Sequence, residues 1–326
     1  MARDGTGLSD GLRREARPAD PAAVAVDDMD PGAARSSGEN FPVALRLLRA
    51  RQREHLMAVY GFARTADDIG DRAPPGERLR LLDELEADLR RLYRRHGGAW
   101  ADRARDHVGG DRGGGKDGDG VQPRSGVVAA LGPAVTECGI PMQLFLDLIL
   151  ANRQDQVVSR YQTFEELAGY CRLSANPVGR IVLHVFGSYS ERRAQLSDAV
   201  CTALQLAEHW QDVAEDLRAD RIYLPAQDME RFGCTPGDLG RPTASPAVRA
   251  LIAFETGRAK TMLDCGAPLI GTLRGTARAA VAGYVAGGRA ALAAIAAAHH
   301  DVLRATPVPR KRRVAAEFAL AFARGR

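Results

Sequence analysis

The chain has 326 residues, a formal net charge of +4 and 45% hydrophobic residues. This length accommodates one large domain with a substantial core, and so small a net charge argues against nucleic acid as a partner. Aromatic residues make up only 6%, so the composition favours helices over sheets. The five cysteines are odd in number and form no CxxC motif, which indicates free thiols in a reducing, cytoplasmic compartment.

Residues 1–36 are rich in Ala, Gly, Asp, Arg and Pro without any periodicity, which predicts a disordered leader. They lack the apolar segment of a secretory signal, and no uninterrupted apolar run in the chain is long enough to span a bilayer. Apolar residues at helical spacing then predict a helix over 52–66 and a second helix from Glu77 onward.

Residues 97–126 contain the stretch VGGDRGGGKDGDG, which predicts a flexible insertion between helices. A Gly-Lys pattern at 110–116 imitates a phosphate-binding loop, but Asp117 stands where Ser or Thr would hold magnesium, so we reject that interpretation. Four prolines confine 223–246 to a loop. A single helical domain over 37–305 is the simplest organisation. Further helices are expected near 127–137, 141–152, 164–186, 195–217, 246–271 and 276–304.

The segment YGFARTADDIGD places Asp67 and Asp71 four residues apart, on one face of a helix. Like charges at this spacing destabilise a helix by roughly 0.2–0.5 kcal/mol per pair, so a compensating cation is expected. Mg²⁺ prefers oxygen ligands and is commonly held by one or two carboxylates plus substrate phosphates. Arg64, three residues before Asp67, is placed to pair with a carboxylate or a phosphate.

A second acidic row follows in LQLAEHWQDVAED, where Glu208, Asp212 and Asp216 recur every four residues and Gln205 precedes them. His209 is expected to point away from this row, because its neighbours define the acidic face. One such row alone is compatible with an ordinary solvated helix face. Two rows facing each other across a helical cavity would hold magnesium ions that turn a diphosphate into a leaving group.

These motifs resemble those of the head-to-head prenyl synthases, the squalene and phytoene synthase family. The resemblance runs from about Ser37 to Ile295. It implies the family fold, a single-domain all-α isoprenoid-synthase bundle with a central cavity. The matching motifs are ENFPV at 39–43, YxFARxADDIGD at 60–71, RQD at 153–155, YCRLSANPVGR at 170–180, QLAEHWQDVAED at 205–216 and DRIYLP at 220–225.

By matching position, the resemblance implies roles for particular side chains. The expected catalytic residues are Tyr60 and the four aspartates Asp67, Asp71, Asp212 and Asp216. The same aspartates are expected to bind Mg²⁺, with Glu208 as a further ligand where many family members have Asn. The expected substrate-binding residues are Arg64 and Arg221 on the diphosphate, and Tyr60, Asn40 and Gln205 around it. Tyr223 and Tyr284 are expected at the cavity, where aromatic faces stabilise a cation by about 0.5–2 kcal/mol; core packing is the alternative for Tyr284.

The opening ENFPV resembles the hopanoid-pathway branch of the family, the hydroxysqualene synthases. That branch implies Mg²⁺-dependent ionisation of presqualene diphosphate and water capture of the cation, giving hydroxysqualene and pyrophosphate. No GxGxxG motif follows a predicted strand, so hydride capture is not indicated. The alternatives are a squalene, presqualene diphosphate or phytoene synthase that couples two prenyl diphosphates, and a non-catalytic scaffold member.

Residues 306–326 predict a closing basic helix, roughly over 310–324. Val314, Phe318 and Phe322 recur every four residues beside the cluster RKRR. Such a helix is suited to peripheral contact with an anionic membrane, and packing back onto the bundle is the alternative.

Overall fold

The structure is a computed structural model that describes residues 48–105 and 122–324, with side chains omitted for 96–105. The predicted leader over 1–36 and the predicted site residue Asn40 lie outside these residues. Every regular element in the described part is a helix, and its single isolated bridge joins Arg160 to Ile222. The all-α prediction is therefore confirmed.

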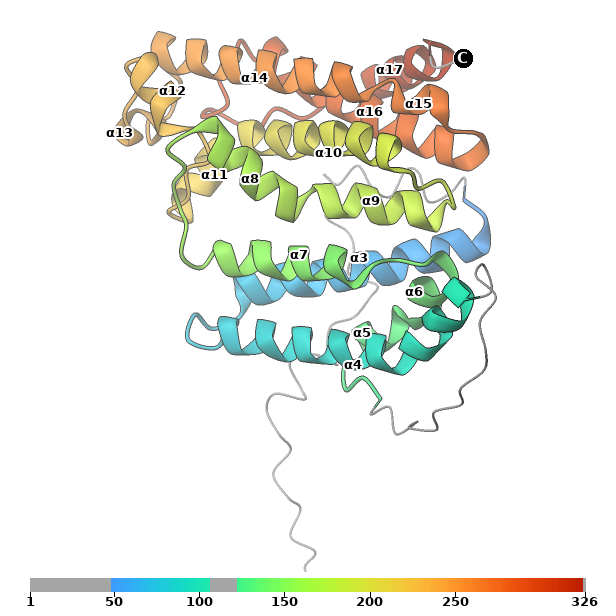
Figure 1. The fold of residues 1–326 in the computed structure, drawn as a ribbon. Helices are drawn as coiled ribbons and strands as arrows, with labels where there is room; N and C mark the ends of the chain where they lie inside the picture. Colours follow the sequence, from blue (N-terminus) through green and yellow to red (C-terminus); the bar gives the residue numbers. More distant parts are fainter. Residues whose placement is uncertain (1–47, 106–121, 325–326) are drawn as a thin grey trace, which may run out of the picture. The chain divides into compact units, whose positions relative to one another are not determined.

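The helices of the described part stack side by side (Figure 1). In that view α4 lies lowest, followed upward by α3 and α7, then α8 and α9, then α10, and finally α14. They are α3 (Ala50–Arg72), α4 (Arg78–Arg105), α5 (Gly126–Ala130), α6 (Gly132–Cys138), α7 (Met142–Gln154), α8 (Phe164–Ser174), α9 (Asn176–Val185), α10 (Glu191–Gln211), α11 (Val213–Arg218), α12 (Ala226–Arg231), α13 (Pro236–Leu239), α14 (Pro246–Gly266), α15 (Leu269–Thr272), α16 (Gly275–Ala297) and α17 (Lys311–Arg324).

Two apolar clusters form the core. The first joins α3, α4, α5, α6, α7 and α9, and contains Leu82, Leu85, Leu89 and Leu92 of α4. It also contains Phe62 and Phe145, whose rings meet edge to face at 5.1 Å. The second is centred on α10, α14 and α16, with the fully buried Trp210 among its members. Tyr284 of α16 packs against the first cluster, so it links the two.

Several predicted helices are shorter than the apolar rhythm indicates. The predicted helix over 164–186 breaks at Ala175. Pro177 has no N–H to donate a hydrogen bond to the preceding turn, and it stands instead in the first turn of α9. The predicted helix over 195–217 is interrupted at Asp212, between α10 and α11. Conversely, α4 continues through Arg105, into the stretch predicted as an insertion.

The prediction that 223–246 is entirely loop is wrong. Two short helices, α12 and α13, occupy part of it. Pro225 directly precedes α12 and Pro236 is the first residue of α13. Proline is favoured at such positions, because the first residues of a helix have no intrahelical hydrogen bond to lose.

Helix α17 forms where a basic helix was predicted, and its aromatic residues pack inward. Phe318 and Phe322 contact the second core cluster, and the guanidinium of Arg278 lies 4.5 Å from the centre of the Phe322 ring. The predicted apolar stripe therefore packs against the bundle at α16, which was the expected alternative to membrane contact.

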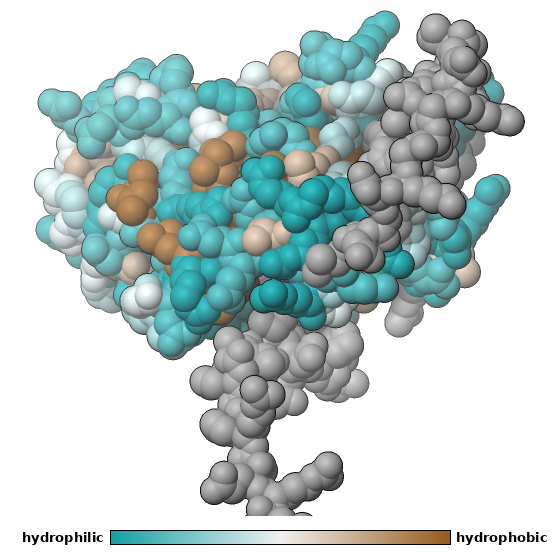
Figure 2. Space-filling model, turned by 60° about the horizontal axis from the view of Figure 1, so that its bottom comes forward, coloured by the Kyte–Doolittle hydropathy of each residue, from teal (hydrophilic) through white to brown (hydrophobic). Residues whose placement is uncertain are grey.

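One described helix, α16, is long and apolar enough to cross a membrane, although no uninterrupted apolar run was expected. Arg278 and Arg289 interrupt it, and most of it is buried inside the bundle. The face in Figure 2 is largely hydrophilic, with apolar residues gathered toward its left side. Among the described residues, Val157 and Val308 are the most exposed large apolar side chains, at 79% and 72%.

Candidate active site

The first acidic segment forms the last turns of α3. Asn152 of α7 donates a hydrogen bond through Nδ2 to Asp67 Oδ1, at 3.0 Å. Asp68, between the two predicted ligands, is buried and pairs with Arg64 and Arg72 at 3.3 and 3.2 Å. Arg64 was predicted to bind a diphosphate. In the structure its guanidinium instead pairs with the carboxylate of Asp68, one turn further along the same helix.

A glycine allows α7 to approach this segment. A Cβ atom added to Gly70 would lie 2.4 Å from Asn152 Oδ1, well inside van der Waals contact. Gln156 also donates to the carbonyl of Gly70, at 3.1 Å. The absence of a side chain at this position thus lets Asn152 reach Asp67.

The second acidic segment is divided by the break at Asp212. Its backbone leaves the helical region there, with φ −103° and ψ 14°, yet Asp212 N still donates to Glu208 O and Asp216 N to Asp212 O. Asp212 and Asp216 are partly buried, whereas Glu208 is exposed. The three carboxylates therefore differ in environment, although their spacing is regular.

Arg221 joins the two segments. Its Nη1 atom lies 3.0 Å from Asp71 Oδ1, while its backbone N–H donates to the carbonyl of Asp216. The chain reverses just before it, at Asp220, which has a φ of 57°. Two segments that are widely separated in the sequence thus meet at one guanidinium.

Three carboxyl groups of the two acidic segments, those of Asp67, Asp212 and Asp216, have raised pKa values. Burial, followed by the charge of Asp212, raises the pKa of Asp216 to about 7. Asp67 retains solvent contact, but the protein atoms around it, and then the charge of Asp71, raise its pKa to about 6 even though Asn152 opposes the shift. Burial also raises the pKa of Asp212. The site has more carboxylates than nearby cations can neutralise.

Asp155 belongs to the same site and was not among the predicted site residues. Its Oδ2 atom accepts a hydrogen bond from the Tyr170 hydroxyl at 2.8 Å, while its Oδ1 atom is buried with no hydrogen-bond partner in the described part. Burial raises its pKa to about 6, and the charges of Asp71 and Asp67 contribute in the same direction.

Aromatic rings pack behind these carboxylates. Tyr223 stacks on Tyr161 and on His209, with ring centres 5.9 and 3.7 Å apart, and Tyr170 lies 5.8 Å from Tyr223. A cavity of about 10 Å³, space for roughly one water, lies among residues that include His209, Asp216, Arg221 and Tyr223.

The expectation that His209 points away from the acidic row is wrong. Its Nδ1 atom lies 4.0 Å from Asp216 Oδ2, and its Nε2 atom lies 3.3 Å from Gln205 Nε2. Burial lowers its pKa to about 3, so the imidazole is neutral beside the carboxylate. The break at Asp212 changes the helical phase and brings the two side chains to the same side.

The remaining predicted residues lie at varying distances from this centre. Tyr223 is buried at the site, and Tyr60 is half-buried on α3. Tyr284 packs against the first core cluster, the alternative expected for it. Asp155 and Tyr170 stand within the matched motifs RQD and YCRLS, so these motifs were the available signal for them.

The donor set fits a hard divalent cation that a substrate helps to bind. No group of three or more His, Cys, Asp or Glu side chains in the described part forms a ready metal site. The crowded carboxylates with raised pKa values and the unpartnered Asp155 Oδ1 atom nevertheless form an oxygen-rich, negatively charged surface. Mg²⁺ typically takes one or two protein carboxylates and completes its shell with phosphate oxygens and water.

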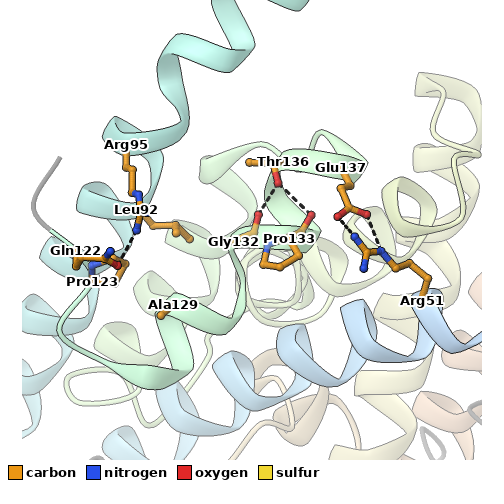
Figure 3. Close-up of a pocket in the computed structure, with 10 residues that line it drawn as sticks. All are labelled: Arg51, Leu92, Arg95, Gln122, Pro123, Ala129, Gly132, Pro133, Thr136 and Glu137. Carbon is orange, nitrogen blue, oxygen red and sulfur yellow. Dashed lines mark hydrogen bonds and ion pairs between the residues drawn. The ribbon is translucent and has the colours of Figure 1, made fainter. Parts of the chain in front are cut away.

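A larger cavity, of about 360 Å³, lies elsewhere, between α3, α4, α5 and α6 (Figure 3). Its lining shares no residue with the acidic site. The residues around it include Arg51, Arg95, Thr136 and Glu137.

An all-α bundle with two acidic helical segments joined at an arginine has the architecture of an isoprenoid synthase. The chain belongs to the squalene/phytoene synthase family, whose profile matches residues 34–314. This confirms the resemblance, and members of the family are enzymes of the prenyltransferase type.

Two relatives carry the same description. The hydroxysqualene synthase of Rhodopseudomonas palustris is 35% identical over 72% of this chain and 72% of its own length. The hydroxysqualene synthase of Zymomonas mobilis is 37% identical over 68% of this chain and 66% of its own. The crystal structure of the squalene synthase HpnC from Alicyclobacillus acidocaldarius is 39% identical, covers 82% of this chain and 91% of that one, and superposes with a TM-score of 0.69.

Proposed function

We propose that the chain ionises presqualene diphosphate and that water captures the resulting cation, giving hydroxysqualene and pyrophosphate for hopanoid biosynthesis. The contact between Arg221 and Asp71, which joins the two acidic segments, is the observation that carries the proposal. The relatives described as hydroxysqualene synthases support this choice of substrate.

The acidic residues would hold Mg²⁺ around the diphosphate. The proposed ligands are Asp67, Asp71, Glu208, Asp212 and Asp216. Bound Mg²⁺ would neutralise the diphosphate and improve it as a leaving group. The raised pKa values of Asp67 and Asp216, caused first by burial and then by neighbouring carboxylates, support this role, because a nearby cation favours the charged form of a carboxyl group.

Arginines and polar side chains would orient the diphosphate. Arg221 already lies between the two acidic segments, and Arg64 would turn from Asp68 toward a phosphate oxygen. Guanidinium groups suit this task because their forked donors match phosphate geometry. Tyr60, Gln205 and Asn40 complete the proposed diphosphate pocket.

The aromatic residues would stabilise and shield the cation. The Tyr223 ring lies at the site in a stack with His209 and Tyr161. Electron-rich ring faces attract a passing cation. The captured water must lose a proton, and Asp155 Oδ1, buried and without a hydrogen-bond partner in the described part, is a suitable acceptor.

Product analysis tests the proposal. Purified full-length protein is incubated with Mg²⁺ and either presqualene diphosphate or farnesyl diphosphate. We expect hydroxysqualene from the first substrate and no coupling of the second. Formation of presqualene diphosphate or phytoene from prenyl diphosphates would instead identify a coupling enzyme, and inactivity toward every substrate would favour a scaffold protein.

We further propose that the basic C-terminal segment holds this cytoplasmic enzyme against an anionic membrane, where its lipid substrate resides. Arg310, Lys311, Arg312 and Arg313 are exposed, and Val308 beside them is 72% exposed. Phe318 and Phe322 pack on the bundle, so contact would be made by the charged segment rather than by the aromatic stripe. Basic residues near an anionic surface contribute about 1 kcal/mol each.

Vesicle sedimentation tests this surface. Replacing Arg310, Lys311 and Arg312 by Ser should abolish binding to vesicles that contain an anionic phospholipid. Replacing three exposed arginines elsewhere, Arg172, Arg192 and Arg274, provides the matched control. Unchanged binding in the first variant, or equal loss in both, would contradict the proposed surface.

A further inference from the structure

A thiol, an imidazole and a carboxylate lie in a row where α6 meets the beginning of α3. Cys138 Sγ is 3.3 Å from His55 Nδ1, and His55 Nε2 is 3.4 Å from Glu137 Oε2. Arg51 pairs with Glu137 on the far side, with Nε 2.9 Å from Oε2 (Figure 3). None of these residues belongs to the acidic site.

The burial of the three groups is graded. His55 is only 5% exposed, and its Nε2 atom makes no hydrogen bond of good geometry in the described part. Cys138 is half-buried and Glu137 is exposed. The cavity of about 360 Å³ shown in Figure 3 is lined by Glu137 and Arg51. Cys138 directly follows Glu137 in the chain and keeps part of its surface exposed, while the imidazole of His55 is almost entirely shielded from solvent.

This order of groups is that of an activated nucleophile. A nucleophile within hydrogen-bond reach of a base, with the base oriented by a third group, is the general pattern. Burial and the charge of Glu137 raise the pKa of the Cys138 thiol, so little thiolate exists before reaction. Reactivity then depends on proton transfer to His55 during attack, which is general base catalysis.

We propose that Cys138 is a site of oxidation by hydroperoxides, with His55 as the base and Glu137 as the residue that orients it. The thiol proton passes to His55 Nδ1 as the sulfur attacks one peroxide oxygen. The O–O bond breaks, and the departing oxygen takes the proton back from His55. The products are a sulfenic acid on Cys138 and water or an alcohol, so the sulfur loses two electrons and the peroxide gains them.

Two features favour a hydroperoxide over a larger electrophile. The half-buried sulfur admits a small reagent more readily than a bulky one. The departing oxygen of a peroxide also needs a proton, which the neighbouring imidazole holds at that moment. The modification, on the last residue of α6, would lie beside His55 near the beginning of α3, the helix that carries Asp67 and Asp71 near its other end.

Cysteine-resolved trapping tests the proposal in the full-length protein. Hydrogen peroxide is added with dimedone, and adducts at each cysteine are followed by peptide mass spectrometry. Cys265 is exposed and serves as the internal control, while Cys171 is buried. At neutral pH we expect Cys138 to be trapped at least about tenfold faster than Cys265, because base catalysis accelerates attack. Equal or slower trapping of Cys138 overturns the proposal, and this comparison needs no variant.

Two variants assign the roles. His55→Gln should reduce the rate at Cys138 to that of Cys265, and Glu137→Gln, at an exposed position, should reduce it by a smaller factor. A Cys138 rate in His55→Gln equal to that of the wild type contradicts His55 as the base.

Discussion

The two carboxylate oxygens of Asp155 lie in different environments. One oxygen accepts a hydrogen bond from Tyr170, and the other is buried with no such partner in the described part. An unpaired buried acceptor costs free energy, and burial beside other acids raises the pKa of this group to about 6. A carboxyl group with a pKa of about 6 is half-protonated at that pH, and it is therefore suited to exchange a proton with a reacting water.

Replacing Asp155 by Asn should lower kcat with little change in KM. Loss of a general base costs about 10²-fold or more in rate, whereas the amide keeps the shape of the side chain. Asp147→Asn in α7, the helix that ends directly before Asp155, is the matched control, because the Asp147 carboxylate accepts a hydrogen bond from the exposed Gln143. Steady-state kinetics with presqualene diphosphate provide the measurement, and equal kcat values for both variants would exclude Asp155 as the base.

The raised pKa of Asp216 predicts how stability depends on pH. Because the folded protein raises this pKa from 3.8 to about 7, the protonated form is favoured by folding. Its stabilisation is complete below the unfolded pKa and is lost as the pH rises through about 7. Without divalent ions, the melting temperature of Asp216→Asn should therefore fall less between about pH 5 and about pH 8 than that of the wild type. An equal fall in both proteins would contradict the assigned shift.

At the level of residues, spacing along a helix identified the acids but not their partners. Asp67 and Asp71 could be predicted because a four-residue repeat shows in the sequence. Asn152 and Tyr170 could not be assigned by periodicity, since they reach the site from other helices. His209 was misplaced because the prediction assumed an unbroken helix through Asp212.

At the level of elements, the contact between α3 and α7 positions the first acidic segment. Gly70→Ala would place a methyl group 2.4 Å from Asn152 Oδ1. Such overpacking costs about 1–3 kcal/mol and should displace Asn152 from Asp67. We expect a lower free energy of unfolding and reduced turnover.

Gly61 on the same helix provides the control. A Cβ atom there would meet nothing within 4 Å, and Ala is a better helix former than Gly by about 1 kcal/mol. Gly61→Ala should therefore be neutral or stabilising in urea denaturation. Equal effects of the two substitutions would show that the close approach of α7 is unimportant.

The helices themselves were predictable wherever an apolar stripe runs without proline. Leu82, Leu85, Leu89 and Leu92 of α4 are all buried, as their spacing indicates. Helix boundaries were harder to predict, because a proline that cannot continue one helix can stand in the first turn of the next, as Pro177 does in α9. Propensity alone does not decide between these outcomes; tertiary contacts do.

At the level of the whole molecule, the active site depends on bringing α3 and the end of α10 together. The separation along the chain is large, and the sequence carries no direct sign of the contact between Asp71 and Arg221. The sequence led only to the expectation that the two acidic rows face each other across a cavity, with Arg221 on the diphosphate. The structure adds the details of pairing and burial.

Magnesium and pyrophosphate together should stabilise the folded protein by binding across both segments. A ligand that binds the folded state alone raises the melting temperature. The increase should be larger near pH 8 than near pH 5, because Asp67 and Asp216 are ionised at the higher pH, given pKa values of about 6 and about 7. Thermal-shift titrations measure it, and an increase independent of pH would indicate binding elsewhere.

The central claim is that the two acidic segments together ionise presqualene diphosphate and that water captures the cation. The most direct measurement is turnover of presqualene diphosphate with Mg²⁺ in isotopically labelled water, comparing the wild type with Asp67→Asn combined with Asp71→Asn. The account predicts labelled hydroxysqualene and pyrophosphate from the wild type and neither product from the variant. Unlabelled product, or equal turnover by the variant, would contradict it.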